Sequence, residues 1–178
     1  MSSAQNENET LVDYITGHTV LNIGAEANRQ QIERLLVETK GYSKTQIEVD
    51  APIEMEISGE SYHSYVDLVV SVKGRRYMVI KCAPGSLASR EREVVAAARL
   101  LDTYQVPLAV ATDGRTAIVW DTVSGDNLGA GIEVIPSHSE AEAAFDPHTL
   151  LPLAEMRRSR QQLIFRSYDS MNVNRKLR

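Results

Sequence analysis

The sequence has very little cysteine, and its histidines are not arranged for metal binding. Cys82 is the one cysteine among 178 residues, so the chain can form no internal disulfide and no cysteine-cluster zinc site. The four histidines are scattered, without the close spacing of a metal-ligand motif. A glycine-rich phosphate-binding loop and a nucleophile with an adjacent base are also missing. We therefore expect a protein of a reducing cytoplasm that folds without a structural metal.

Long apolar runs are missing as well. The longest runs, such as Val106–Ala111, have about six residues, whereas a membrane span needs roughly 18 or more. The residues that follow Met1 include neither a basic start nor an apolar stretch, so we expect no secretory signal and no contact with a membrane. Apolar residues make up 43% and charged residues 24% of the chain, which is typical of a globular protein of one domain.

Positive charge is scarce except near the C-terminus. The net charge is −5, yet the segment from Glu155 to Arg178 contains seven basic and two acidic side chains, a net charge of +5. The rest of the chain is acidic, so it is not a nucleic-acid binder of the usual basic kind. Arg157, Arg158 and Arg160 lie in this basic segment and are the candidate nucleic-acid-binding residues. The alternative is that they form an ordinary solvated face of a helix.

The hydrophobic pattern predicts an α/β (α+β) fold with a mixed central sheet flanked by helices. The expected order is helix, three strands, helix, two or three strands, and C-terminal helices. These elements fall at residues 25–39, 46–57, 64–72, 75–83, 89–105, 107–112, 116–121, 132–135, 138–145 and 151–166. We expect an N-terminal arm over residues 1–24, partly disordered, a main domain over residues 25–136, and a helical, basic extension over residues 137–178.

Asp67 is the most informative residue, because it is an acid inside an apolar strand. A buried carboxylate is costly unless it is paired or bound to a metal. The tight turn at Lys73-Gly74 brings the next strand back beside it, and on that strand Lys81 is again a lone charge after an apolar run. We therefore expect Asp67 and Lys81 to face one another on adjacent strands.

The order of these segments resembles the N-terminal domain of type I restriction enzyme motor (R) subunits, which belong to the PD-(D/E)XK nuclease superfamily. The resemblance covers about residues 25–125 and implies a restriction-endonuclease-like fold with an origin in DNA cleavage. With 178 residues there is no room for motor domains, so a stand-alone domain is expected. The matching segments are Arg29–Tyr42, Val66–Val70, Lys73-Gly74, Met78–Pro84 and Val106–Gly114.

The resemblance also implies a catalytic motif, from which this chain departs. In the family an Asp on the second strand and a Glu-x-Lys on the third surround a divalent metal that activates water. The family text reads roughly Val-Ile-Glu-Cys-Lys-Ala-Pro, whereas this chain reads Val79-Ile-Lys-Cys-Ala-Pro84, one residue shorter. Without a gap, Lys81 stands in the place of the Glu and Ala83 in the place of the Lys.

Two interpretations of this departure are open. In one, Lys81 keeps the role of the family's Lys, and Glu93 from the following helix replaces the missing acid. Asp67, Lys81 and Glu93 are then catalytic, and Asp67 and Glu93 hold Mg²⁺; Glu91 is the next candidate, and Glu26 resembles a further acid of the family. In the other, Asp67 and Lys81 form a structural ion pair, and the two helical acids only favour the helix dipole.

The departure predicts weak or absent cleavage by a DNA-related nuclease fold. An active Mg²⁺-dependent endonuclease and a non-catalytic protein-binding scaffold are the alternatives. Mg²⁺ is expected as a cofactor only if the site is active. The expected partner is DNA, with a protein partner or a second copy of the chain as further candidates.

Overall fold

The computed structural model describes residues 9–171 and contains a six-stranded sheet. The strands of this sheet are β3 (Ile47–Ile57), β4 (Glu60–Val72), β5 (Arg75–Cys82), β6 (Leu108–Thr112), β7 (Ala117–Asp121) and β8 (Asn127–Ala130). The helices are α1 (Glu26–Arg34), α2 (Glu91–Leu100), α3 (His138–Ala144) and α4 (Glu155–Asp169). A π-helical turn, Leu35–Thr39, continues α1, and a separate hairpin consists of β1 (Thr10–Val12) and β2 (Thr19–Leu21).

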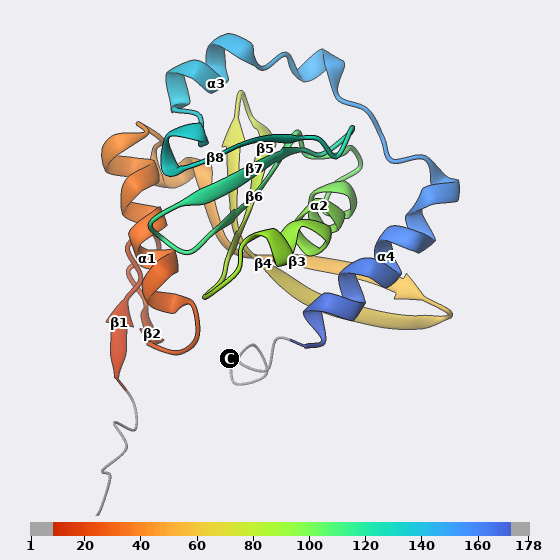
Figure 1. The fold of residues 1–178 in the computed structure, drawn as a ribbon, viewed down its shortest axis with the longest axis horizontal. Helices are drawn as coiled ribbons and strands as arrows, with labels where there is room; N and C mark the ends of the chain where they lie inside the picture. Colours follow the sequence, from red (N-terminus) through yellow and green to blue (C-terminus); the bar gives the residue numbers. More distant parts are fainter. Residues whose placement is uncertain (1–8, 172–178) are drawn as a thin grey trace, which may run out of the picture.

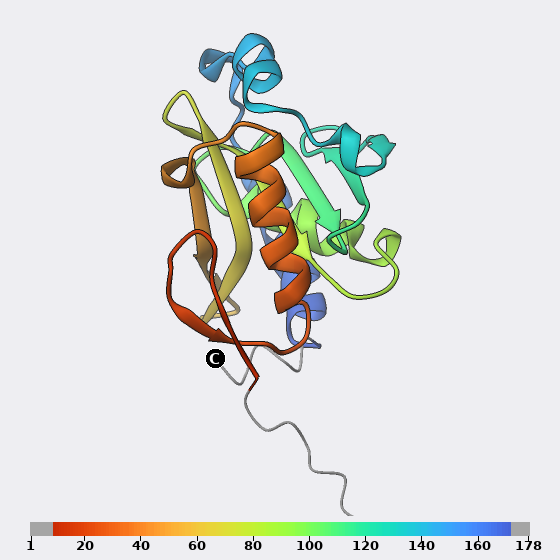
Figure 2. The ribbon, with the colours of Figure 1, turned by 90° about the vertical axis from the view of Figure 1, so that its left-hand side faces the viewer.

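The sheet is mixed, and its strands lie side by side in chain order from β3 to β8. Strands β5 and β6 are parallel, and the other neighbours are antiparallel. Because parallel strands need a crossover connection, α2 lies between β5 and β6 along the chain. Helix α1 lies against one face of the sheet, while α2 and α4 lie against the other (Figures 1 and 2). The α/β fold predicted from the sequence is confirmed.

Two hydrophobic cores lie on the two faces of the sheet. On one face, Val69 and Val79 pack with α2 and with Phe165 of α4. On the other face, Met78 and Ile80 pack with Ile32 of α1. This division follows from the alternation of side chains along a strand, which sends successive residues to opposite faces.

Strand β3 is an edge of the sheet, and this explains how it contains a proline. Pro52 lacks an N–H group, and an edge strand can lack one donor without breaking a ladder. Asp50 interrupts the pairing of β3 with β4: Val49 before it is opposite Leu68, and Ala51 after it is opposite Val66. Asp50 has a φ of 52°, in the left-handed region, which Asp tolerates better than most side chains. At this interruption, Asp50 of β3 lies across from Asp67 of β4.

Several details differ from the sequence-based expectations. Residues 132–134 form a 3-10 turn and not part of a strand, while the last strand of the sheet, β8, lies earlier in the turn-rich segment. The helix expected over residues 89–105 is shorter, since α2 begins at Glu91 and ends at Leu100. The described part of the N-terminal segment contains a hairpin, β1–β2. The disorder predicted for the N-terminus falls mainly on residues outside the described range.

Candidate functional site

Asp67 lies on β4 where the sheet brings β5 alongside. Leu68 is opposite Ile80, so the same antiparallel register continues to Asp67 and Lys81. The carboxylate of Asp67 accepts a hydrogen bond of 2.8 Å from the backbone N–H of Cys82, and its Oδ2 lies 3.8 Å from the Nζ of Lys81. The adjacency of Asp67 and Lys81 expected from the sequence is therefore present.

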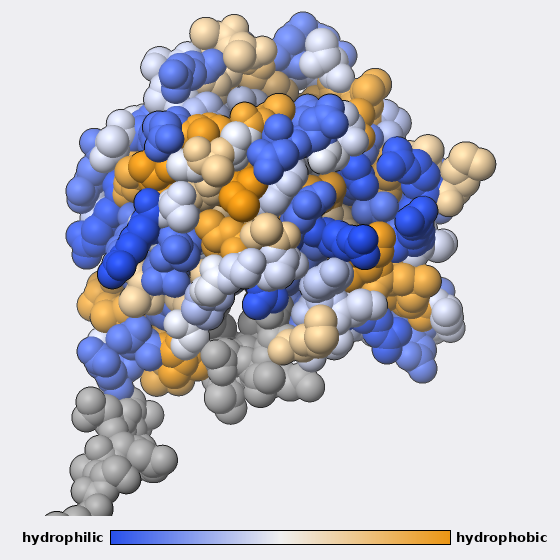
Figure 3. All heavy atoms as spheres, viewed as in Figure 1, coloured by the Kyte–Doolittle hydropathy of each residue, from blue (hydrophilic) through white to orange (hydrophobic). Residues whose placement is uncertain are grey.

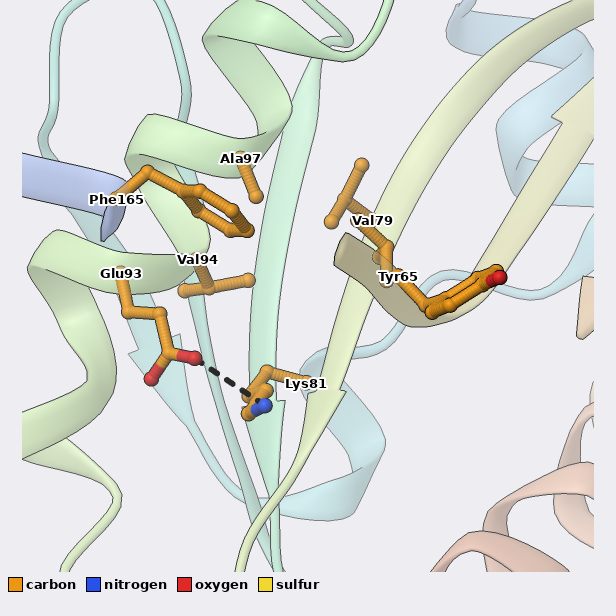
Figure 4. A pocket seen from close by; sticks show the side chains of 8 residues that line it. Tyr65, Val79, Lys81, Glu93, Val94, Ala97 and Phe165 are labelled. Carbon is orange, nitrogen blue, oxygen red and sulfur yellow. Dashed lines mark ion pairs between the residues drawn. The ribbon is translucent and has the colours of Figure 1, made fainter. Parts of the chain in front are cut away.

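Glu93 comes to the same place from the first turns of α2. Its Oε1 lies 3.2 Å from the Nζ of Lys81 (Figure 4). Its Oε2 lies 3.4 Å from a guanidinium nitrogen of Arg90. The fold thus brings together Asp67, Lys81 and Glu93, the three residues singled out by the sequence; we call them the Asp67 site. The ammonium group of Lys81 makes ion pairs with both carboxylates.

The Asp67 site is deeply buried and has an apolar surround. The exposed fractions are 7% for Asp67, 8% for Lys81 and 1% for Glu93. Lys81 and Glu93 line a small pocket with a volume of about 210 Å³, which includes space open to solvent. The other residues that line this pocket are mostly apolar. They are Tyr65, Val66, Val79, Val94, Ala97 and Phe165, the last from α4 (Figure 4). The space beside the acids is therefore poorly suited to a phosphate.

The donor set does not fit a magnesium ion. Mg²⁺ retains its hydration shell strongly and needs carboxylate oxygens that are open to it. Here Asp67 and Glu93 both contact the ammonium of Lys81. A third carboxylate could have come from the position two residues before Lys81 on the same face of β5, but that residue is Val79. Within residues 9–171, no cluster of three or more His, Cys, Asp or Glu side chains has a geometry that could hold a metal.

The other two acids named from the sequence do not join the site as metal-facing groups. Glu91 is exposed at the start of α2. Glu26 is buried in α1, where its Oε1 accepts hydrogen bonds from Arg29 and from Gln30. The sequence analysis missed Arg29, whose side chain is 2% exposed and lies within reach of four acids. These acids are Asp13, Glu26, Glu33 and Asp50; we call this group the Arg29 cluster.

The Arg29 cluster lies close enough to the Asp67 site for their charges to act on the same residue. Burial raises the pKa of the Cys82 thiol well above its ordinary value, and the charge of Asp67 raises it further. Arg29 and Lys81 act in the opposite direction, and Glu33 acts with Asp67. Cys82 is thus a buried, protonated thiol between two charged groups, which agrees with a packing role and not with that of a nucleophile.

The basic residues of α4 lie apart from the Asp67 site on an exposed face. Arg157 and Arg160 are exposed, while Arg158 is half-buried and its Nε lies 3.2 Å from the carboxylate of Glu155. Burial and then the positive charge of Arg157 lower the pKa of Arg99 on α2. The start of α4 therefore concentrates positive charge. Arg166, further along α4, lies 3.9 Å from the carboxylate of Glu60, and the basic residues from Arg175 on lie outside the described range.

Two further observations concern surfaces. On the face shown in Figure 3, hydrophobic residues appear as small patches separated by hydrophilic ones. In the part of the chain that the structure describes, none of the helices has both the length and the apolar character needed to cross a membrane.

Comparison with known proteins identifies a family for most of the sheet and its flanking helices. A sequence model of the family described as type I restriction enzyme R protein N terminus matches residues 24–136. The match contains the Asp67 site and most of the Arg29 cluster, and it ends before α3 and α4. Neither a curated protein nor a solved structure matches the chain significantly. Since the match covers more than half of the sequence, the chain belongs to the family of type I restriction enzyme R protein N-terminal domains.

Proposed function

We propose that this chain is a DNA-associated nuclease-fold domain in which Lys81 neutralises the former cleavage centre. The observation that carries the proposal is the position of the Lys81 ammonium, 3.2 Å from Glu93 and 3.8 Å from Asp67. A positive charge at that point satisfies both carboxylates and repels a divalent cation. The domain keeps the family fold and lacks the means to activate water through a metal.

The charges at the site support this proposal. Asp67 and Glu93 are balanced by Lys81 and Arg90, and Asp67 also accepts a backbone hydrogen bond. Ionised groups that are buried to this degree persist only when they are paired and hydrogen-bonded. The network thus explains, without any metal, why two acids and a lysine occur in an apolar region.

The register of β4 and β5 supports the same conclusion. Lys81 lies opposite Asp67 in the antiparallel register of the two strands. In an ungapped alignment with the family text, as the resemblance implies, Lys81 stands in the place of the family's Glu. Ala83 then takes the place of the family's Lys, and its N–H is used in pairing with the carbonyl of Thr112. In this alignment both third-strand groups of the motif are absent.

We propose that DNA, if it binds, contacts the start of α4 and not the Asp67 site. Arg157 and Arg160 are exposed there, and Arg99 lies nearby. The rest of the chain is acidic, and phosphate backbones are attracted by clustered positive charge. DNA binding would then be independent of cleavage.

The second candidate is an active endonuclease in which Glu93 replaces the missing acid of the motif. It is favoured by one observation: Glu93 does reach the Lys81 ammonium from α2, so the three groups converge. In this case Lys81 would orient water or phosphate. The two candidates make opposite predictions for cleavage.

A plasmid-nicking assay with Mg²⁺ or Mn²⁺ distinguishes them. The neutralised site predicts that purified wild type and Asp67→Asn nick equally little. The active site predicts metal-dependent nicking that is lost in Asp67→Asn and in Glu93→Gln, and retained in Glu91→Gln, since Glu91 is an exposed acid of the same helix. Circular dichroism of each variant checks that a loss of nicking does not reflect unfolding.

A further inference from the structure

The N-terminal hairpin, residues 10–21, is attached to α1 mainly by polar contacts. The backbone N–H of Tyr14 donates to the Oε1 of Gln30 over 2.7 Å, and that of Ile15 donates to the Oε2 of Glu33 over 3.3 Å. Asp13 lies 3.1 Å from a guanidinium nitrogen of Arg29. Figure 2 shows the hairpin beside α1.

Of the apolar side chains of the hairpin, Ile15 is partly buried against the core on the α1 face of the sheet, whereas two strand residues contribute less. Val12 is 64% exposed and Leu21 is 40% exposed. The ring of Tyr14 does lie against the cationic groups of Arg34 and Lys44, at 4.7 Å and 4.0 Å from its centroid. Because hydrophobic burial is small, the attachment depends on the charges below the hairpin.

Glu33 is the unusual member of these charges. Its side chain is fully buried, and its Oε1 has no hydrogen-bond partner among the described residues, although the Nε of Arg29 lies 3.6 Å away. Burial, and then the charge of Asp13, raise the pKa of Glu33 from 4.5 to about 7. Burial among other acids favours the protonated form of Glu33, and this effect outweighs the ion pair with Arg29 and the hydrogen bond from Ile15, both of which favour the ionised form.

The groups that face Glu33 come from every element around it. Asp13 comes from the hairpin, Arg29 and Glu26 from α1, and the Cys82 thiol from β5, while Asp50 of β3 lies on the other side of Arg29. When Glu33 is ionised, four carboxylates share one guanidinium. Undocking the hairpin removes Asp13 and opens Glu33 to water, so it relieves this repulsion.

We propose that the N-terminal hairpin is a pH-sensitive clasp, docked on α1 while Glu33 is protonated and released when Glu33 ionises. Docking is then strongest below the pKa of Glu33 in the released state, weakens as pH rises above that value, and levels off once pH has passed the pKa of the docked state. If Glu33 returns to its ordinary value of 4.5 on release, the docking equilibrium weakens about tenfold between about pH 6 and about pH 8. Release would uncover the Arg29 side of α1.

Amide hydrogen exchange of Tyr14 and Ile15 tests the clasp, after correction for the intrinsic pH dependence of exchange. In the wild type, the protection of both amides should fall about tenfold between about pH 6 and about pH 8. In Glu33→Gln, whose side chain has no charge to lose, the protection should not change with pH. Glu38→Gln is the matched control, because Glu38 is an exposed acid that accepts from the Tyr14 hydroxyl; it should retain the fall.

Two results would overturn the clasp: protection in the wild type that does not depend on pH, or the same fall in Glu33→Gln as in the wild type. If Glu33→Gln does not fold, carbon-13 NMR of the side-chain carboxyl in the wild type decides. Titration of Glu33 near pH 7, together with the Ile15 amide, supports the clasp. Titration below about pH 5.5, close to the ordinary range of a glutamate, rejects it.

Discussion

The ammonium group of Lys81 lies 3.2 Å from the carboxylate of Glu93 and 3.8 Å from that of Asp67, so one cation serves two buried acids from different elements. Asp67 comes from β4 and Glu93 from α2, and Lys81 on β5 joins them. The arrangement stabilises the contact between the sheet and α2. In the proposed function, this positive charge takes the position that a divalent metal would need.

Removing the charge of Lys81 should lower the free energy of unfolding more than removing the charge of Asp67. Asp67→Ala leaves Lys81 with Glu93 still beside it, whereas Lys81→Met leaves two buried carboxylates without their shared cation. Removing one partner of a buried pair typically costs about 3–5 kcal/mol. We expect Lys81→Met to fall at the upper end of this range and Asp67→Ala to cost less, as measured by urea denaturation.

The same site gives a double-mutant test. Replacing Asp67 and Lys81 together with apolar residues should cost less than the sum of the two single replacements, because neither charge is left alone. Additive costs would mean that the two side chains do not interact in the folded protein.

The π-helical turn that continues α1 packs on the sheet and gives a test of the core. Leu36 is fully buried with Ile32 beneath β4 and β5, so Leu36→Ala should lower the free energy of unfolding by about 2–5 kcal/mol. Leu35, which is only partly buried, is the matched control and should cost less when truncated. Equal, small losses at both positions in chemical denaturation would contradict the packing of this turn.

The stability of the whole fold should depend on pH through Glu33. Its pKa is about 7 in the folded protein and lies near its ordinary value of 4.5 in the unfolded chain, so the unfolded state releases its proton first as pH rises. Its contribution to stability is therefore fully present below about pH 4.5 and is lost as pH rises through about 7, by up to about 3 kcal/mol. Urea midpoints from about pH 5 to about pH 8 should fall in the wild type. In the Glu33→Gln variant the urea midpoint should fall less over this pH range, because the contribution of Glu33 is missing. The same dependence of the midpoint on pH in both proteins would refute a role of Glu33 in stability.

DNA binding, if present, should respond to the exposed arginines of α4. Replacing Arg157 and Arg160 with Glu should weaken binding strongly and reduce its dependence on salt, because each lost phosphate contact releases one counterion fewer. Arg75→Glu is the control, since it reverses the charge of an exposed arginine on another element, β5, and should leave binding nearly unchanged. Fluorescence anisotropy with a labelled duplex at several salt concentrations measures both effects; unchanged binding of the charge-reversed protein would place the DNA site elsewhere.

The fold was largely predictable from the sequence, because its signals are local. The apolar stripe with Leu36, the edge position of Pro52 and the hairpin at Lys73-Gly74 each follow from periodicity or turn chemistry. Strand β8 was misplaced because its residues, including Gly129, are turn-like in composition, and only pairing with β7 makes them a strand.

The candidate site was predictable only in part. Asp67 and Lys81 stand out as charges in apolar strands, and Glu93 follows from the resemblance to the family. Arg29 and Glu33 carried no such signal, because charged residues on a helix usually face solvent. Both residues contact the N-terminal hairpin: Arg29 pairs with Asp13, 16 residues earlier in the sequence, and Glu33 accepts from the N–H of Ile15. Contacts of this kind depend on tertiary structure and leave no periodic pattern.

The most direct test of the central claim is the binding of Mn²⁺ to the wild-type protein, followed by electron paramagnetic resonance of the unbound ion. The Lys81 ammonium should prevent a specific site, so that wild type and Asp67→Asn bind the same small, non-stoichiometric amount at millimolar metal. One equivalent of Mn²⁺ bound by the wild type, and lost in both Asp67→Asn and Glu93→Gln, would contradict the account and identify the Asp67 site as a metal centre.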